Sequence, residues 1–232
     1  MTDDRRSSWR QRCALPVRVA LLVASLVWIG WVEASTPPKK SVELLLDFPK
    51  GWAHFSAEKE TKLEDVWKID GKVLKCLGKP SGYLRTKTLY ENFELELEWK
   101  YPINENGNSG ILIHTNGPDK IWPVSIQVQL HLPKVGEILP QKGAKTANPA
   151  PQVKDLKLAV NKWHKCRIRS ENGKITVFIK DMKVNEVGGC EPKKGWITLQ
   201  SEGSEVHFRN IKVTKLLPGS NSAKKEKKTG DR

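Results

Sequence analysis

The sequence of 232 residues lacks several features that would place it in a familiar class. No two cysteines have the Cys-x-x-Cys spacing of a zinc site. No module that interleaves aromatic and basic residues for nucleic-acid binding is present. The sequence also contains no internal repeat and no convincing amphipathic helix. These absences argue against a zinc domain, a nucleic-acid partner and a helical fold.

The chain also lacks an apolar run long enough to span a membrane readily. Its uncharged stretch from Val19 to Val32 is about 14 residues long, whereas a spanning helix needs about 20. Five arginines precede this stretch, and the segment Val32-Glu33-Ala34 follows it. A basic region, a short apolar core and a small-residue exit are typical of a secretory signal peptide over residues 1–34. The alternative is a retained anchor. We therefore expect a secreted or periplasmic protein.

Only three cysteines would remain after cleavage of residues 1–34, and basic residues outnumber acidic ones. Cys76, Cys166 and Cys190 form an odd set, so no disulfide pairing can be derived. Each lies in or beside an apolar run, which predicts a buried small hydrophobe. The formal charge is +14, and a lysine-rich tail occupies residues 218–232. That tail is predicted to be a solvated, disordered end, with adhesion to an anionic surface as the alternative.

Short β-type runs separated by turn signals make up the rest. Residues 35–41 are predicted to be a linker because of their paired prolines and lysines. In Val66–Cys76 the pair Asp70-Gly71 favours a two-residue hairpin turn. Phe93–Trp99 alternates apolar residues with glutamates, as a half-buried strand does. Further strands are predicted at the ranges 110–114, 124–130, 166–170, 174–180, 195–200 and 205–216.

Residues 133–162 follow no such pattern. They are rich in proline, lysine and small residues, which predicts a long loop. About a dozen short strands without helices indicate an all-β protein, an antiparallel β-sandwich that forms a single domain over residues 42–217.

Two blocks of the sequence are similar to a known family. They are GYLRTKTLYENFELELEWKYPINENGNSGILIHTNGPDKIWPVSIQVQL, from Gly82 to Leu130, and GWITLQSEGSEVHFRNIKV, from Gly195 to Val213. Together they resemble the 3-keto-disaccharide hydrolases, also described as 3-keto-glucoside 1,2-lyase/hydratase domains. The resemblance runs from about Val42 to Leu216. It implies a concanavalin A-like jelly roll whose concave sheet can cradle a glycan or a 3-keto sugar.

The resemblance also singles out a turn and the strand after it. In the family, a turn matching Asn108-Ser109-Gly110 is a hallmark, and the histidine corresponding to His114 commonly faces the cleft. From the residues alone, a lone histidine at the end of an apolar strand is more often a core or rim residue. Asn108 also suits the turn itself.

One departure from the family lies in the next strand. Gln127 stands where members commonly have a glutamate, and Gln129 matches a family glutamine. The period of a strand places both amides on one sheet face, where they can bind sugar hydroxyls. Glutamine does not exchange protons as a carboxylate does. If the family glutamate is the acid or base, this chain is weakened or inactive. Glu137 falls near a family aspartate.

The second block contributes three further candidates. Gln200 and Glu202 share a face if the strand runs through Glu202. Glu202 is the best surviving carboxylate, with a solvated turn residue as its alternative. Arg209 binds the sugar in one interpretation and holds a buried carboxylate in the other.

Sugar rings present apolar C–H faces that stack on aromatic rings, so the tryptophans are also candidates. Trp67, Trp99 and Trp196 are predicted to pack in the core. Trp122 lies in a Gly-Pro-Asp-Lys-Ile-Trp-Pro loop beside the expected cleft and is a candidate for substrate binding.

The implied reaction is elimination followed by hydration. A ketone at C3 acidifies the C2 hydrogen of a glucoside, so a base removes it and an acid protonates the departing oxygen at C1. Water then adds to the resulting 2-hydroxy-3-keto-glucal. His114, Glu202 and Glu137 are the catalytic candidates. The substrate-binding candidates are Asn108, Trp122, Gln127, Gln129, Gln200 and Arg209.

No cofactor or metal is evident from residue spacing. Spacing does not test for a cation bound by residues of separate strands. Two other functions compete with catalysis. One is a non-catalytic glycan-binding module of the same fold, and the other is an exported adhesion or structural domain.

Overall fold

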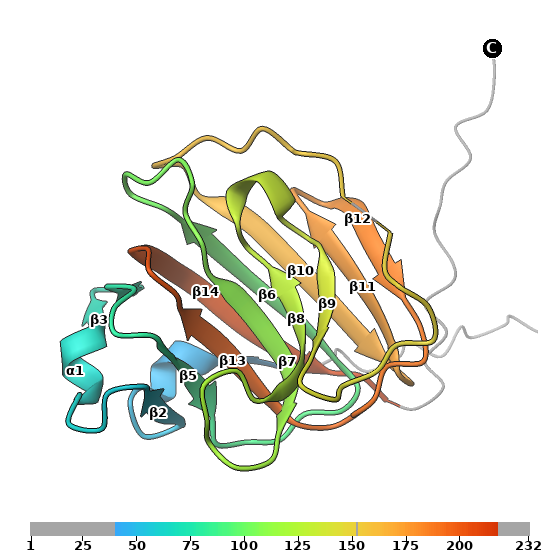
Figure 1. Ribbon diagram of the computed structural model, residues 1–232, viewed down its shortest axis with the longest axis horizontal. Helices are drawn as coiled ribbons and strands as arrows, with labels where there is room; N and C mark the ends of the chain where they lie inside the picture. The colour runs from blue at the N-terminus through green and yellow to red at the C-terminus, as the bar shows by residue number, and fades with distance from the viewer. Residues whose placement is uncertain (1–39, 152, 218–232) are drawn as a thin grey trace, which may run out of the picture. The chain divides into compact units, whose positions relative to one another are not determined.

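Two antiparallel β-sheets pack face to face in the computed structural model, which describes residues 40–151 and 153–217 (Figure 1). The β-sandwich predicted from the sequence is therefore confirmed. The predicted signal peptide and basic tail, and most of the predicted linker, lie outside the described residues.

The larger sheet has eight strands, and β14 lies near its middle. Its order is β12-β11-β10-β6-β14-β4-β3, and β1 also pairs with β14. The strands are β1 (Ser41–Glu43), β3 (Trp67–Asp70), β4 (Val73–Cys76), β6 (Phe93–Lys100), β10 (His164–Glu171), β11 (Lys174–Ile179), β12 (Met182–Val187) and β14 (Val206–Lys215).

The smaller sheet has six strands in the order β2-β5-β13-β7-β8-β9. They are β2 (Trp52–Ser56), β5 (Gly82–Thr86), β7 (Gly110–Asn116), β8 (Val124–Gln129), β9 (Ile138–Gln141) and β13 (Trp196–Ser201). Three one-turn helices are also described: η1 (Leu44–Asp47), α1 (Leu63–Val66) and η2 (Leu132–Lys134).

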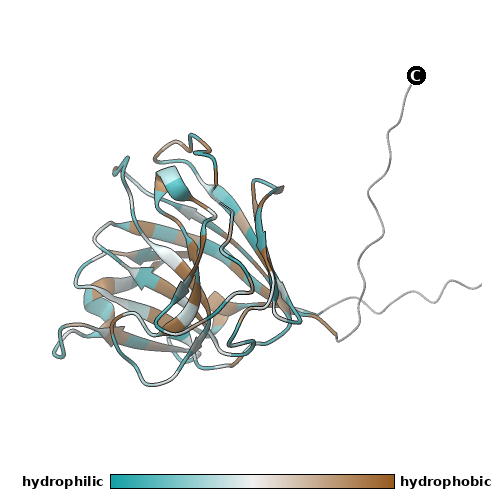
Figure 2. Cartoon of the chain, turned by 45° about the vertical axis from the view of Figure 1, so that its right-hand side comes forward, coloured by the Kyte–Doolittle hydropathy of each residue, from teal (hydrophilic) through white to brown (hydrophobic). Residues whose placement is uncertain are grey.

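The core lies between the sheets and is built by alternation along the strands. Phe93, Leu95, Leu97 and Trp99 of β6 are fully buried, as the period-2 pattern predicted, while the glutamates between them face outward. Figure 2 shows the same alternation of apolar and polar residues along other strands. Because burying one large apolar side chain stabilises the fold by roughly 1.5–3 kcal/mol, this repeated pattern fixes which face of each strand is inside.

Five strands lie outside the ranges predicted from the sequence, namely β1, β2, β5, β9 and β12. β9 lies inside the stretch expected to be a loop, and β12 follows the predicted hairpin of β10 and β11. β9 has a proline at its third residue and pairs only with β8, so it is an edge strand, where a missing N–H is tolerated. The described remainder of the stretch, residues 142–151 and 153–162, is irregular, as predicted.

The three cysteines of the described chain, Cys76, Cys166 and Cys190, are buried and unpaired. Burial raises the pKa of each thiol, so they act as small apolar residues, as predicted. Within the described residues, no helix is long and apolar enough to cross a membrane.

Candidate functional site

The outer face of the six-stranded sheet gathers uncharged hydrogen-bonding side chains. Its inner residues, such as Ile111, Val128 and Leu199, belong to the core, so their strand neighbours point outward. These neighbours, together with the residues that extend β7 and β13, form what we call the amide face: Asn108, Gln127, Gln129, Gln200 and Glu202. Four of the five are amides, and one is a carboxylic acid.

Strand register brings this set together. Gln200 of β13 pairs with Tyr83 of β5 on one side, and Gly110 of β7 pairs with Gln129 of β8 on the other. Continuing the Leu199–Ile111 register places Glu202 opposite Asn108. The set therefore spans three adjacent strands at one end of the sheet.

Gly110 lets two of these amides lie over the strand between them. A Cβ atom at this position would lie 2.1 Å from Gln200 Oε1 and 3.0 Å from Gln127 Nε2. Any larger residue would push at least one amide away. Gly110 therefore keeps the centre of the amide face open, which explains in physical terms why a glycine follows Asn108-Ser109.

The two glutamines of β8 are oriented as donors. Gln127 Oε1 accepts a hydrogen bond of 2.9 Å from Gln141 Nε2. Gln129 Oε1 accepts from the backbone N–H groups of Leu130 and His131, at 3.0 and 3.1 Å. With both carbonyl oxygens occupied, the Nε2 groups are left for a ligand, since no acceptor among the described residues takes a hydrogen bond from either.

On β13 and just before β7, by contrast, side-chain oxygens that could accept a hydrogen bond have no donor. Asn108 Oδ1, Gln200 Oε1 and Glu202 Oε2 are buried and have no hydrogen-bond partner in the described chain. An unpartnered buried acceptor costs about 1–3 kcal/mol. Burial also raises the pKa of the Glu202 carboxyl. Three such oxygens side by side form a site that needs donors from outside the protein.

A second cluster of side chains on the same sheet fixes the position of the β7–β8 loop. This cluster was not predicted from the sequence. Asp119 of this loop accepts hydrogen bonds from Tyr83 Oη at 2.8 Å and from Arg85 Nε at 2.9 Å. The guanidinium of Arg85 lies 4.0 Å from the ring centroid of Trp196. The Arg85 hydrogen bond is the main reason that the pKa of Asp119 is lowered. The only sequence signal was Gly117-Pro118-Asp119, read as part of a loop beside the cleft.

The structure moves His114 away from this face. β7 and β8 shift register between Ile113 and Asn116, and His114 has a left-handed backbone with φ of 53°. Its side chain turns between the sheets, where Nε2 lies 2.8 Å from Ser170 Oγ of β10. Burial lowers the pKa of His114 to about 4, so the imidazole is neutral. His114 is therefore a core residue, which corrects the prediction that it faces the cleft.

Arg209 also lies elsewhere, on the outer face of the eight-stranded sheet. Its Nε donates to Glu98 Oε2 at 2.7 Å, and its guanidinium stacks 4.2 Å from the Trp163 ring centroid. The alternative interpretation, an arginine that holds a carboxylate, therefore describes it better than sugar binding, but this carboxylate is half-buried and not buried as predicted.

The remaining candidates lie around the amide face. Glu137 directly precedes β9, and its backbone oxygen accepts from Gln129 N at 2.9 Å, so it flanks the β8 side. Trp122 is half-buried in the β7–β8 loop, with φ of 54°. Trp67 and Trp99 are core residues as predicted. Trp196 is not, because it lies beneath Arg85 on the outer face and is only half-buried.

Among the described residues, no group of three or more His, Cys, Asp or Glu side chains is placed to hold a metal ion. The chemistry available from the amide face itself is hydrogen bonding from both sides and proton exchange at one carboxyl group.

A family model described as the 3-keto-alpha-glucoside-1,2-lyase-like domain matches residues 46–214. No curated protein matches the chain. Among solved structures, a candidate glycosyl hydrolase from Parabacteroides distasonis is 24% identical, with a TM-score of 0.60, and the match covers 77% of this chain and 100% of that one.

Two further structures share the fold at lower identity. The Bacillus licheniformis β-glucanase is 14% identical, with a TM-score of 0.54, over 79% of this chain and 100% of that chain. The carbohydrate binding module CBM66 from Bacillus subtilis is 13% identical, with a TM-score of 0.53, over 70% of this chain and 94% of that chain. These similarities establish the concanavalin-like β-sandwich fold. The function has to be inferred from the side chains of the site.

Proposed function

The chain belongs to the 3-keto-alpha-glucoside-1,2-lyase-like family, and from this membership we propose that it cleaves 3-keto-glucosides by C2 proton abstraction, 1,2-elimination and hydration. The observation that carries the proposal is the division of the amide face into donors and acceptors. Amide N–H groups lie on β8, and unpartnered oxygens lie on β13 and at the start of β7.

A 3-keto sugar matches that division. Its ketone oxygen only accepts hydrogen bonds, and it faces the Nε2 groups of Gln127 and Gln129. Its hydroxyls donate to the oxygens of Asn108 and Gln200, which otherwise lack donors. Negative charge develops on the C3 oxygen when the C2 proton leaves, so the two amide donors stabilise the enolate as it forms.

Glu202 is the base in this proposal. Burial raises the pKa of its carboxyl, which makes the carboxylate a stronger base than an exposed glutamate. It takes the C2 proton, and the C–H electron pair forms the C2=C3 bond of the enolate while the ketone π pair moves to the C3 oxygen. The ketone then re-forms, the C2=C3 pair moves to make the C1=C2 double bond, and the C1–O bond breaks. The leaving oxygen keeps that bond's electron pair and receives the proton from Glu202. Water then adds across C1=C2 to give the free 3-keto sugar.

One carboxyl group suffices for both proton transfers. Glu137 lies three strands from β13, next to β9, and neighbouring strands are about 4.8 Å apart. This separation places Glu137 at the flank of the site. We therefore assign it a smaller role than Glu202. No ordinary pair of glycosidase carboxylates is needed for this chemistry.

Gln127 fits the reaction as a neutral donor. A glutamate at this position would present a second acceptor to the ketone and would compete with Glu202 for protons. In this proposal the departure from the family therefore changes how the ketone is held and does not remove the base.

The test is to incubate the full chain and a Gln127→Glu variant with a 3-keto-glucoside and to follow the aglycone and 3-keto-glucose by mass spectrometry. We expect turnover by the native chain and a loss of about 100-fold in Gln127→Glu, because one enolate donor is lost. Turnover by Gln127→Glu alone would contradict this role of Gln127 and mark the native chain as a disarmed binder.

A second candidate function is a non-catalytic glycan-binding module. The glutamine at position 127 favours it, because a chain without that carboxylate retains groups that bind sugar hydroxyls. Saturable glycan binding without product by either protein would support it.

We also propose that the protein acts outside the cytoplasm, which rests on the sequence of residues 1–34. Cleavage after residue 34, read from the N-terminal sequence of the exported protein, tests this localisation.

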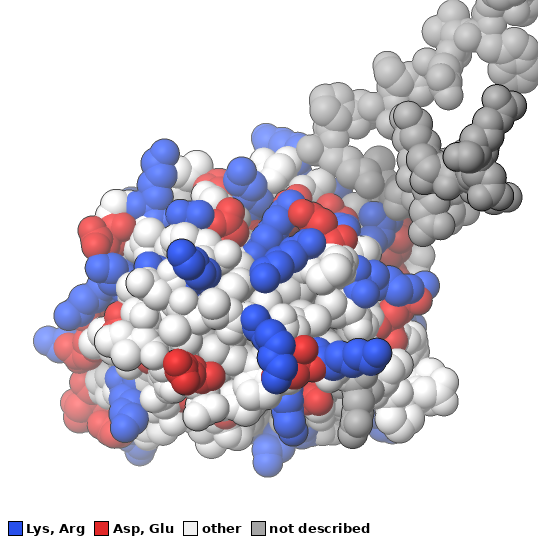
Figure 3. All heavy atoms as spheres, turned by 90° about the horizontal axis from the view of Figure 1, so that it is seen from above, with Lys and Arg blue, Asp and Glu red and all other residues white. Residues whose placement is uncertain are grey.

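The described part carries more basic than acidic side chains on the face in Figure 3, which suits an anionic surface as an additional partner.

A further inference from the structure

The β7–β8 loop, residues 117–123, crosses the outer face of the six-stranded sheet. Its Asp119 is bonded to Tyr83 and Arg85 of β5, and β5 is separated from β7 by β13 in the strand order. The loop therefore passes over β13. In Figure 1 it extends from the lower ends of β7 and β8 toward β5. Since Tyr83 pairs with Gln200, the tip of the loop lies beside the amide face.

The part of the sheet around this contact is closed to solvent. Tyr83 and Leu112 are 1% and 0% exposed, yet neither belongs to the core between the sheets, which is filled by their strand neighbours such as Leu84. Both side chains therefore point outward. Thr198, which pairs with Arg85 and with Leu112, is also fully buried. Outward-facing residues are buried only where something covers them, so this face of the sheet has a cover.

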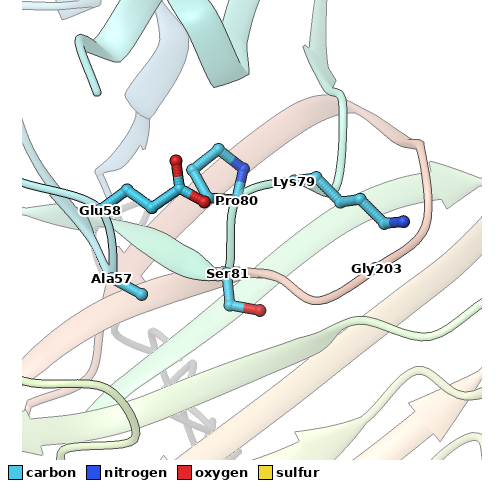
Figure 4. Close-up of a pocket in the computed structure, with 6 residues that line it drawn as sticks. All are labelled: Ala57, Glu58, Lys79, Pro80, Ser81 and Gly203. Atoms are coloured by element: carbon cyan, nitrogen blue, oxygen red, sulfur yellow. The ribbon is translucent and has the colours of Figure 1, made fainter. Parts of the chain in front are cut away.

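The cover also closes off two of the binding groups. Gln127 pairs with Leu112 of the covered row and is 5% exposed, and Gln200 is 2% exposed. A sugar ring is too large to reach these amides unless part of the cover moves. The open depression where β2, β5 and β13 end does not expose them, because its lining consists of other residues (Figure 4): Ala57, Glu58, Lys79, Pro80, Ser81 and Gly203.

One carboxylate fastens the loop to the sheet. Asp119 accepts hydrogen bonds from Arg85 Nε at 2.9 Å, from Arg85 Nη2 at 3.1 Å and from Tyr83 Oη at 2.8 Å. The guanidinium of Arg85 is itself held 4.0 Å from the ring centroid of Trp196. A bidentate pair between arginine and a carboxylate is both strong and directional. These contacts therefore fix the loop in one position on β5.

The loop itself has the properties of a segment that can open. Residues 116–121 are exposed to solvent. Gly117 and Trp122, near its two ends, have left-handed backbones with φ of 81° and 54°. This conformation is unfavourable for a bulky residue such as tryptophan, so the closed loop is strained at Trp122. A short, exposed and strained segment opens at a lower cost than the strands beneath it.

We infer that the β7–β8 loop is a lid over the amide face and that Asp119, bonded to Arg85 and Tyr83, is the latch that keeps it shut. The inference rests on the proposed function for the identity of the ligand. A closed site binds its ligand only during the fraction of time in which the lid is open. The latch therefore sets how fast a 3-keto sugar enters. Because the same bonds re-form over the bound sugar, the latch also sets how fast the sugar leaves.

The first measurement needs no sugar. Hydroxyl-radical footprinting, read by mass spectrometry, reports the exposure of the three tyrosines of the chain. In Asp119→Asn, Tyr83 should be labelled about five- to tenfold faster, because the lid is open for more of the time. Tyr101, which is buried in the core, should be labelled as in the native chain. Asp70→Asn is the matched control, since it also removes an aspartate from an exposed ion pair, with Lys75, and should change neither tyrosine.

Two outcomes of the footprinting would overturn the lid. One is equal labelling of Tyr83 in the native chain and in Asp119→Asn. The other is a parallel rise at Tyr101, which would make Asp119 a residue that stabilises the whole fold.

The second measurement follows the entry of methyl 3-keto-glucoside in a stopped-flow instrument by tryptophan fluorescence. A Glu202→Gln background stops turnover, so that binding alone is observed. Adding Asp119→Asn should raise the association and dissociation rates about five- to tenfold and leave Kd within about twofold. Arg85→Lys retains the positive charge without the two-pronged donor, so it should give a smaller increase. Unchanged or slower association would overturn the lid, because the loss of a structural or sugar-binding residue does not speed entry.

The two measurements separate this inference from the proposed function. If the native chain neither binds nor turns over a 3-keto-glucoside, a rise in labelling at Tyr83 alone in Asp119→Asn still supports the lid, while the proposed function fails. If the native chain turns over the glucoside and the labelling of Tyr83 does not respond to Asp119→Asn, the catalysis stands and the lid is rejected.

Discussion

The two outer faces of the sandwich treat their polar groups in opposite ways. On the eight-stranded sheet, charged side chains pair with one another, as in Arg167 with Glu94, Lys165 with Asp181 of the β11–β12 turn, and Arg209 with Glu98. On the amide face of the six-stranded sheet, the side chains are mostly neutral, and three of their oxygens lack a donor within the described chain.

The difference distinguishes a surface whose charged groups mostly pair with one another from one whose buried oxygens are left for a ligand. Exposed ion pairs are worth about 0–1 kcal/mol each, so the charged face is a weakly stabilising, solvated surface. A buried acceptor without a donor destabilises the fold by about 1–3 kcal/mol. Three of them in one place are explained if a ligand supplies the donors, as sugar hydroxyls do.

The largest effect is expected from Glu202→Gln, which removes the only carboxyl group of the amide face. Turnover of a 3-keto-glucoside should fall at least 100-fold, because glutamine does not take up the C2 proton. The acid limb of the native pH–rate profile should lie above the ordinary pKa of a glutamate, because burial raises the pKa of Glu202.

Stability gives the control for that variant. With its pKa raised in the folded state, Glu202 binds a proton more tightly when folded, so native stability falls as pH rises from the unfolded toward the folded pKa. Glu202→Gln should therefore have an equal or higher melting temperature at pH 8. A loss of both turnover and melting temperature would instead mark Glu202 as a structural residue.

A smaller effect is expected from Gly110→Ala, which fills the centre of the amide face. The new methyl group would displace the flexible end of Gln200, because its position lies 2.1 Å from Oε1. Turnover should fall about tenfold while the free energy of unfolding changes by less than about 1 kcal/mol. Gly188→Ala is the matched control, since a Cβ there meets nothing within 4 Å. Full activity in Gly110→Ala would place the reaction elsewhere.

The smallest effect on activity is expected from Arg209→Ala on the charged face. It removes the ion pair with Glu98 and the stacking on Trp163. The free energy of unfolding, measured by urea denaturation, should therefore fall by about 1 kcal/mol. Turnover should be unchanged. A tenfold loss of turnover would return Arg209 to the binding site and remove the contrast between the two faces.

The fold was largely predictable because its alternation is strong. β6 and the β10–β11 hairpin follow from period-2 patterns, and the Asp70-Gly71 hairpin follows from its turn residues. β9 was not predicted because an edge strand tolerates proline, so the composition of this segment resembles that of a loop. β12 has a half-exposed pattern with weak alternation, so no clear signal marked it.

The site was predictable only in part, for two physical reasons. The faces of Gln127, Gln129 and Gln200 follow from strand period and are where the pattern placed them. His114 was misplaced because a bulge reverses the side-chain direction after Ile113, and no residue pattern marked that bulge. Arg85 and Asp119 come from segments 34 residues apart, and their contact depends on how the β7–β8 loop folds back.

The most direct test of the account uses a 3-keto-glucoside labelled with deuterium at C2 and the full native chain. Elimination at the amide face predicts that the released 3-keto-glucose has lost the label, measured at early times by mass spectrometry, and that the labelled substrate reacts more slowly than the unlabelled one. Product that retains deuterium, formed at the same rate as from the unlabelled substrate, would contradict C2 proton abstraction and the role assigned to Glu202.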